Sequence, residues 1–129
     1  MIVVAKETYE VAKKIQEIEL SSNQLIFEEG EPGASAYIVK SGSVAVFLMR
    51  DNKKKLLAKI SAGGIIGEMA LIDNGNRLAS AAAIQDTVVM VITKKVFEDK
   101  LNNCDPFVRA IIKIFMEQIR SQHESLTAP

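Results

Sequence analysis

The sequence predicts an α+β fold: an antiparallel β-roll, similar to a double-stranded jelly roll, flanked by an N-terminal helix and by C-terminal helices. Between about residues 20 and 93, short β-rich runs alternate with clusters of glycine, proline, asparagine and aspartate, as in rolls and barrels. At both ends, apolar residues instead recur every three or four positions, which is typical of helices. Because helical and strand patterns occupy separate segments, we expect the helices to lie apart from the sheet.

The N-terminal segment from about residue 7 to 18 is predicted as a helix. Val11, Ala12, Ile15 and Ile18 follow one another at mainly three- and four-residue steps, so they share one face. The apolar run at residues 1–5 is too short for a signal-peptide core or a membrane span.

The β-roll is predicted over residues 20–93. Its strands are expected at residues 25–27, 36–39, 44–49, 56–60, 79–84 and 88–92. Turn signals separate them at residues 29–33, 41–42, 51–52, 63–64 and 73–75.

Two C-terminal helices are expected, over about residues 94–101 and 105–125. Thr93 is a suitable N-cap for the first, and Asp105 followed by Pro106 marks the start of the second. Between residues 107 and 116 only Arg109 and Lys113 are polar, and they share one narrow stripe. The apolar surface is wider than one packing face needs. Either a second subunit or the N-terminal helix is expected to cover the rest.

Length and charge restrict the possible functions. The 129 residues fit one domain, residues 1–129, and 16 basic residues balance 16 acidic ones. Without a strong field of one sign, we expect neither nucleic acid nor a membrane as partner. The single cysteine, Cys104, excludes an internal disulfide and fits a cytoplasmic location. With one histidine, no metal site and no cofactor are predicted.

The segment from Gly67 to Ser80 carries the strongest chemical signal. Gly67 allows a sharp turn or a close backbone approach to a ligand. Arg77 provides a permanently charged fork suited to phosphate oxygens, and Glu68 provides an acceptor suited to a sugar hydroxyl. The small residues Ala79 and Ser80 leave room for a bound group. One cation and one hydroxyl acceptor fit a nucleotide better than a bare anion.

These residues resemble the phosphate-binding cassette of cyclic-nucleotide-binding domains, the family of the catabolite activator protein and the regulatory subunits of cAMP-dependent kinase. The resemblance lies in Gly67-Glu68-Met69-Ala70-Leu71, in Arg77 nine residues after Glu68, and in Ala79. Residues 26–33, 37–39 and 41–46 resemble the first half of the same roll, and the likeness extends over roughly residues 18–125.

The resemblance implies a role for each matching position. Glu68 would accept a hydrogen bond from the ribose 2′-hydroxyl, and Arg77 would pair with the exocyclic phosphate oxygens. The implied ligand-binding residues are Gly67, Glu68, Met69, Ala70, Arg77, Leu78, Ala79 and Ser80. The implied base-lining residues are Val46, Leu57, Arg120 and His123. The last helix would close over the base near residues 120–124, as a lid or as a dimer seam.

Leu78 departs from the family pattern. The residue after the arginine is often Ser, Thr or Ala in this family, and a threonine there favours cGMP by bonding to guanine. Leu78 has no hydroxyl, so the sequence favours cAMP over cGMP. Losing one neutral hydrogen bond costs about 0.5–1.5 kcal/mol.

Three functions are weighed. The first is a non-catalytic sensor that binds a cyclic nucleotide and moves its last helix, which an unidentified partner protein reads. The second is the same roll without ligand, serving as a protein-interaction or homodimerisation module. The third, an enzyme on a cupin-like roll, lacks metal ligands. Only Leu126-Thr127-Ala128-Pro129 follows the last helix, so output is expected to need a partner or an oligomer, unless the chain is excised from a larger protein.

Overall fold

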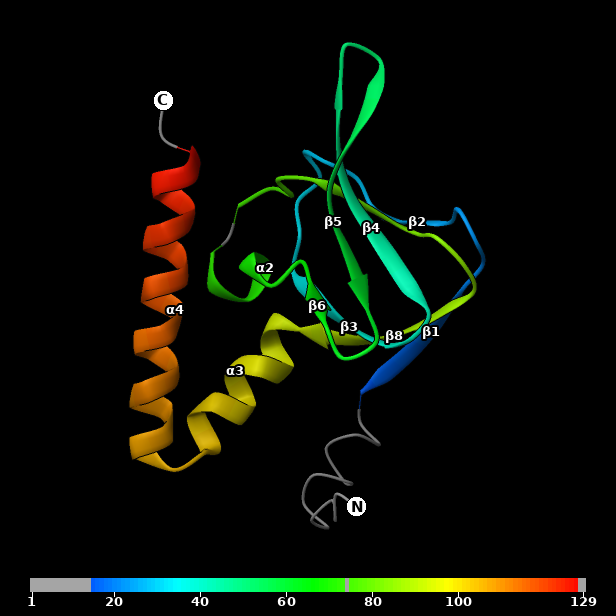
Figure 1. The fold of residues 1–129 in the computed structure, drawn as a ribbon. Coiled ribbons are helices and arrows are strands. Elements are labelled where there is room, and N and C mark those ends of the chain that lie inside the picture. Colours follow the sequence, from blue (N-terminus) through cyan, green and yellow to red (C-terminus); the bar gives the residue numbers. More distant parts are fainter. Residues whose placement is uncertain (1–14, 74, 128–129) are drawn as a thin grey trace.

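Eight strands form two four-stranded sheets that face each other (Figure 1). The computed structural model describes residues 15–73 and 75–127, and the side chains of residues 15–73 and 75–122. One sheet has the strand order β1-β8-β3-β6 and the other β2-β7-β4-β5, with antiparallel pairing throughout. The strands are β1 (Gln16–Leu20), β2 (Leu25–Phe27), β3 (Ser35–Ser41), β4 (Ser43–Arg50), β5 (Lys53–Ser61), β6 (Ile65–Ile66), β7 (Ser80–Ala83) and β8 (Thr87–Thr93). This arrangement confirms the predicted antiparallel roll.

The core lies between the two sheets and is built from small and β-branched side chains. Its buried members are Leu20, Phe27, Val39, Val44, Ile66, Ala81, Ala83 and Val89. Three alanines occupy positions 81–83 of β7, and Ala81 and Ala83 are buried.

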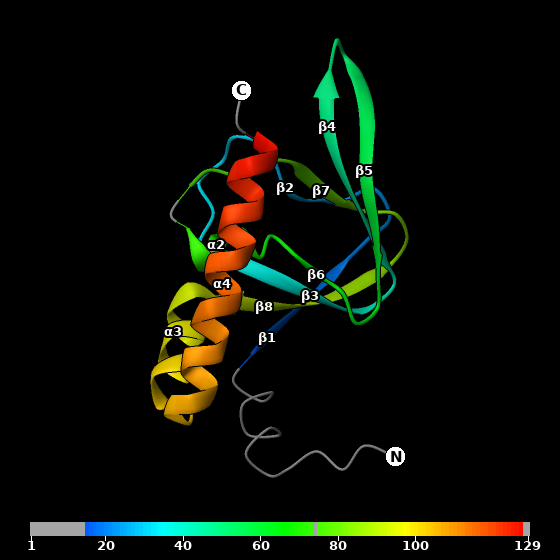
Figure 2. The same cartoon turned by 60° about the vertical axis from the view of Figure 1, so that its left-hand side comes forward.

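The β4–β5 hairpin extends well beyond the rest of the roll (Figure 2). Asp51 and Asn52 connect the strands with φ values of +52° and +61°, the left-handed pair that a two-residue hairpin turn requires. The strand β5 is the outer edge of its sheet, and its first three residues are lysines. Lysines on an edge strand oppose pairing with other chains.

The prediction of an N-terminal helix over residues 7–18 is wrong at the C-terminal end of that segment. Residues 16–18 belong to β1, which pairs with β8 from Gln16 opposite Val91 to Leu20 opposite Thr87. Residues 7–14 lie outside the described residues. Ile18 and Leu20 alternate with Glu17 and Glu19, which fits a strand with one face on the core. The roll thus begins at residue 16 rather than 20, and its last strand ends at Thr93.

Within residues 15–73 and 75–127, three helices accompany the roll: α2 (Met69–Ile72), α3 (Lys94–Asn103) and α4 (Pro106–Thr127). The expected caps are present, since Oγ1 of Thr93 accepts from the Val96 amide at 3.1 Å. Likewise, Oδ1 of Asp105 accepts from the Phe107 amide at 2.8 Å. Helices α3 and α4 each extend two residues beyond the expected ends at 101 and 125.

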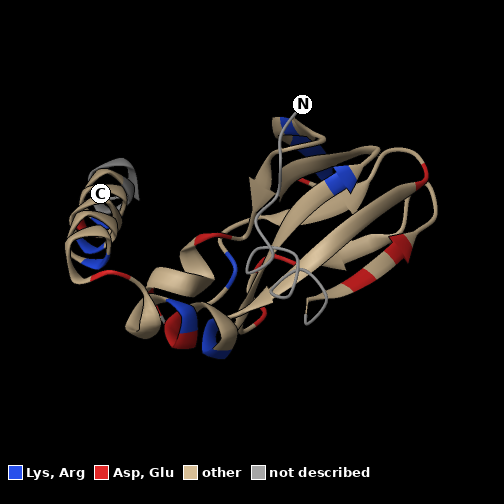
Figure 3. Cartoon of the chain, turned by 90° about the horizontal axis from the view of Figure 1, so that it is seen from below, with Lys and Arg blue, Asp and Glu red and all other residues tan. Residues whose placement is uncertain are grey.

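Helix α4 stands beside α2, on the side away from the sheets (Figures 1 and 2). Much of its apolar surface is uncovered by the described residues: Phe107 is 74% exposed and Phe115 is 57% exposed. Figure 3 shows basic and acidic residues on both the roll and the C-terminal helices. Among the described residues, no helix is long and apolar enough to cross a membrane.

Candidate functional site

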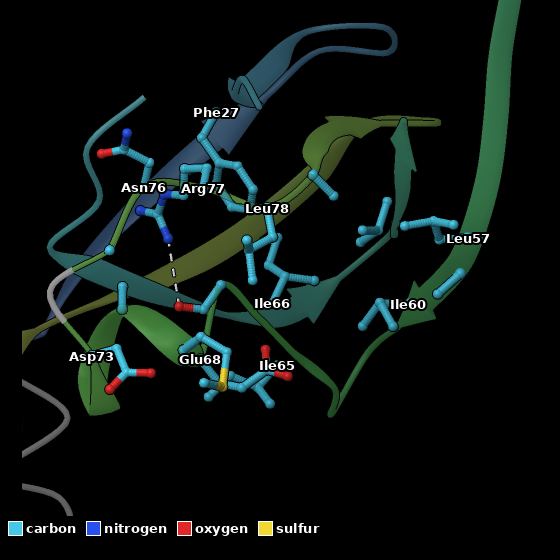
Figure 4. Close-up of a pocket in the computed structure, with 17 residues that line it drawn as sticks. Phe27, Leu57, Ile60, Ile65, Ile66, Glu68, Asp73, Asn76, Arg77 and Leu78 are labelled. Carbon is cyan, nitrogen blue, oxygen red and sulfur yellow. Dashed lines mark hydrogen bonds between the residues drawn. The ribbon is translucent and has the colours of Figure 1, made fainter. Parts of the chain in front are cut away.

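A cavity of about 590 Å³ lies between α2, β6 and the base of the β4–β5 hairpin (Figure 4). It is lined by Phe27, Val46, Leu57, Ala58, Ile60, Ile65, Ile66, Gly67, Glu68, Met69, Ala70, Asp73, Gly75, Asn76, Arg77, Leu78 and Ala79. This volume is within the range of small-ligand sites. Seven of the eight candidate ligand-binding residues therefore line one cavity, together with Val46 and Leu57.

Polar and apolar residues occupy different ends of this cavity. Figure 4 shows Arg77, Asp73 and Asn76 toward one end and Leu57 and Ile60 toward the other, with Glu68 beside Ile65. A ligand that fits must therefore be charged and polar at one end and largely apolar at the other.

Arg77 is held by its backbone and by its side chain. Its amide donates to the Glu31 carbonyl at 2.7 Å, and its carbonyl accepts from the Gly30 amide at 2.8 Å. Its Nη2 donates to the Ser35 carbonyl at 2.8 Å, and its Nη1 donates to the Gly67 carbonyl at 3.4 Å. These contacts fix the guanidinium at the polar end of the cavity.

No carboxylate among the described residues forms an ion pair with Arg77. Carbonyl oxygens satisfy some of its five N–H donors but leave the unit charge in place. The guanidinium is only partly exposed, so its charge is less screened than that of a surface arginine. This arrangement is chemically suited to a small anion.

Glu68 provides a carboxylate acceptor that lines the same cavity as Arg77. Its residue is exposed, and its carboxylate forms neither an N-terminal cap bond on α2 nor an ion pair with another described residue. Gly67, which precedes it, has a φ of +70°, a conformation that favours glycine. An added Cβ there would also lie 2.7 Å from Nη1 of Arg77. The glycine thus permits both the turn and the close approach of Arg77.

One main-chain donor at the cavity wall, the amide of Ala70, is already used by the fold. The Ala70 amide donates to the Gly67 carbonyl at 3.1 Å, inside the turn that begins α2. Met69, Leu78 and Ala79 also line the cavity. Main-chain amides that donate to a bound anion would therefore come from Met69, Leu78 and Ala79 rather than from Ala70.

The apolar end is open to solvent. Leu57 is 50% exposed and Leu78 is 51% exposed, although both line the cavity. Val46, Ala58 and Ile60 complete this wall from β4 and β5. Leaving such side chains in water is unfavourable, so a flat apolar group bound against them would be stabilised.

Two candidate residues, Ser80 and Arg120, are not among the residues that line the cavity. Ser80 is buried, and its Oγ accepts from the Glu29 amide at 2.9 Å, so it stabilises a loop instead. Arg120 lies on α4 and contacts the far end of α2: its Nε pairs with Oδ1 of Asp73 at 2.8 Å, and its Nη2 donates to the Ile72 carbonyl at 2.9 Å. The side chain of His123 lies outside the described residues.

Sequence reasoning missed several lining residues. Phe27, Ile60, Ile65 and Ile66 come from strands, where an apolar residue does not indicate which cavity it faces. Asp73 and Asn76 lie in the segment between Glu68 and Arg77. Their position between two candidate residues was the one available signal.

Known proteins of one family resemble this chain in sequence and in fold. Residues 17–104 match the family model described as "Cyclic nucleotide-binding domain". The cyclic AMP receptor protein of Thermus thermophilus is 37% identical over 71 residues, which cover 54% of this chain and 33% of that protein. The cGMP-dependent protein kinase egl-4 of Caenorhabditis elegans is 32% identical over 96 residues, covering 74% of this chain and 12% of the kinase. The chain thus spans a third or less of these relatives.

A solved structure extends the likeness to the whole roll. The half-site-occupied form of the EAL enzyme Bd1971 aligns with a TM-score of 0.79 at 33% identity, over 84% of this chain and 98% of that chain. The cAMP-bound form of the same enzyme aligns with a TM-score of 0.67 at 33% identity, over 86% of this chain and 30% of that one. The cGMP-bound form aligns with a TM-score of 0.68 at 34% identity, over 85% of this chain and 30% of that one. The family match covers more than half of the chain, and the chain belongs to the cyclic nucleotide-binding domain family.

Proposed function

We propose that this domain is a non-catalytic cytoplasmic sensor that binds cAMP in preference to cGMP and signals through α4. The observation that carries the proposal is the charge of Arg77, which forms an ion pair with no carboxylate of the described residues and shares a cavity with the carboxylate of Glu68. The phosphate of a cyclic nucleotide would bind to Arg77, and the ribose 2′-hydroxyl would donate to Glu68. The purine would lie on Val46, Leu57 and Leu78.

The preference for cAMP follows from the apolar end of the cavity. Guanine has a carbonyl and an amino group where adenine has one amino group, and polar groups lose hydrogen bonds to water on an apolar surface. Leu78 has no hydroxyl to replace them. We expect Leu78→Thr to improve cGMP binding relative to cAMP by up to about tenfold, measured by competition. Leu78→Val, which matches the shape of threonine without its hydroxyl, should leave the ratio unchanged; equal ratios in both variants would contradict the role of Leu78.

Signalling through α4 is supported by the position of Arg120. Its bonds to Ile72 and Asp73 link α4 to the end of α2, whose beginning carries Glu68. A ligand that moves α2 would therefore move α4, and it can shift α4 only by its difference in affinity for the two positions. A partner protein would then recognise the new position of α4.

A second candidate function is homodimerisation through α4. Val108, Phe115 and Ile119 are 46%, 57% and 41% exposed, and with Ile112 they follow the alternating four- and three-residue steps of a coiled-coil seam. Sedimentation velocity tests this: the chain should sediment as a dimer at micromolar concentration, and Phe115→Glu should sediment as a monomer. A monomeric wild-type chain would exclude the seam.

A thermal-shift measurement tests ligand binding. At a concentration of about one hundred times the dissociation constant, a ligand stabilises a fold by about 2.7 kcal/mol. We expect cAMP to raise the melting temperature, 5′-AMP to have little effect, and Arg77→Ala to abolish the cAMP shift. If no nucleotide shifts the wild-type chain, the roll is an interaction module without a ligand.

A further inference from the structure

The guanidinium of Arg77 lies on an aromatic platform. Its Cζ is 4.2 Å from the centroid of the Phe27 ring and 5.9 Å from that of Tyr37. The two rings are stacked, with centroids 6.0 Å apart and an interplanar angle of 30°. We propose that Phe27, supported by Tyr37, is a positioning residue that holds Arg77 for an anionic ligand without neutralising its charge. This inference rests on the proposed binding of a cyclic nucleotide.

Among the described residues, the guanidinium of Arg77 has two kinds of contact: hydrogen bonds to carbonyl oxygens and the contact with the Phe27 and Tyr37 rings. The carbonyls of Ser35 and Gly67 contact Nη2 and Nη1, so they act at the edge of the guanidinium plane. The guanidinium carbon instead lies over the Phe27 ring, which is the favourable position for a cation on an aromatic ring. Because Phe27 is 7% exposed, the core restricts the ring and the ring in turn restricts the guanidinium.

Other arginines show the alternative way of holding a guanidinium. Arg50 pairs with Glu29 through two bonds of 3.1 Å, and Arg120 pairs with Asp73 and Glu117. In each case a carboxylate cancels the charge locally. At Arg77 the support comes from neutral carbonyls and rings, so the full positive charge is available to a ligand.

Phe47, on β4 of the same sheet, supplies a matched control. It is 6% exposed, and Nζ of Lys54 lies 4.3 Å from its ring centroid. Phe47 does not line the cavity among the described residues. Phe27 and Phe47 are thus similarly buried aromatic rings, and each lies under a cation. Of the two cations, Arg77 lines the cavity and Lys54 does not.

The test compares Phe27→Leu with Phe47→Leu in the full chain, using cAMP as the titrant and thermal unfolding as the stability control. Phe27→Leu should weaken cAMP binding by roughly three- to thirtyfold, the range of a cation–π contact. Phe47→Leu should destabilise the fold similarly but leave the affinity within about threefold. Equal dissociation constants for the two variants would overturn the role of Phe27.

A measurement on the unliganded wild-type chain covers the case in which Phe27→Leu does not fold. The side-chain Nε–H proton of Arg77 should be shifted upfield by the Phe27 ring current and should show cross-relaxation with that ring. Absence of both effects would overturn the platform. This readout is independent of nucleotide, so a chain with a formed platform and no cAMP binding would refute the proposed function instead.

Discussion

Gly33 and Arg77 are in such close contact that a side chain at position 33 would collide with the guanidinium. An added Cβ would lie 2.4 Å from Nε of Arg77 and 2.5 Å from its Cζ. Gly33 stands in the turn between β2 and β3, far from Arg77 in sequence. The turn glycine and the arginine therefore form one structural unit, in which the missing Cβ makes room for the cation.

Gly33→Ala should displace Arg77 and weaken cAMP binding. Because a hydrogen bond to a charged group contributes about 1.5–3 kcal/mol, we expect a loss of roughly tenfold or more, measured by calorimetric titration. Circular dichroism and thermal unfolding would verify that the variant still folds. Unchanged affinity in a folded Gly33→Ala chain would show that the position of Arg77 is not needed for binding.

Glu68→Ala should remove the recognition of the ribose. The wild-type chain is expected to bind cAMP about tenfold or more tightly than 2′-deoxy-cAMP, because the hydroxyl donates to a charged acceptor. In Glu68→Ala the two ligands should bind almost equally, as measured by competition. Since Glu68 is exposed, the substitution should leave stability almost unchanged. A variant that still prefers the 2′-hydroxyl would contradict this role of Glu68.

Arg120→Gln should loosen the link between α4 and α2. Both groups of the Arg120–Asp73 pair are partly exposed, with side-chain exposures of 31% and 41%, so the loss of stability should be below about 1 kcal/mol. Hydrogen exchange should nevertheless become faster in α4 and in residues 69–73. Lys113→Gln, on an exposed position of the same helix, provides the control. If both variants exchange alike, Arg120 does not hold α4.

The Glu29–Arg50 pair should make the free energy of unfolding depend on pH. The hydrogen bond from Arg50 is the main cause that lowers the pKa of Glu29 below its ordinary value of 4.5. A carboxyl with a lowered folded-state pKa stabilises the fold above its ordinary pKa, and this contribution is lost as the pH falls through the folded pKa. The stability difference between the wild type and Arg50→Gln should therefore be larger at pH 7 than at pH 3, by chemical denaturation. An equal difference at both values would contradict the pairing.

Local sequence signals predicted much of the fold. The turn at Asp51 and Asn52, the cap at Thr93 and the cap at Asp105 each depend on neighbouring residues, and the structure contains all three. The strand β1 was missed because Ile15 and Ile18 fit a helical step, while Ile18 and Leu20 fit a strand equally well. Only the pairing with β8 distinguishes them, and that pairing depends on residues about 70 positions away.

The candidate site was predictable where its residues lie close together in sequence. Gly67, Glu68 and Arg77 lie within one short segment, and their residue types together with the resemblance to the phosphate-binding cassette indicated a common site; all three line one cavity. Phe27 and Gly33 reach Arg77 only through the folded roll, and a short apolar strand gives no sign of such a contact. Ser80 shows the reverse error: its small polar side chain fits a ligand site in sequence, yet it bonds to the Glu29 amide.

A calorimetric titration of the unmodified chain with cAMP is the most direct test of the whole interpretation. One saturable site per chain is expected, with affinity reduced by at least about tenfold in Arg77→Ala, since a charge-assisted contact is lost. Heats no larger than those of dilution, or identical binding curves for the two chains, would mean that the cation beside Gly67 does not receive a nucleotide phosphate.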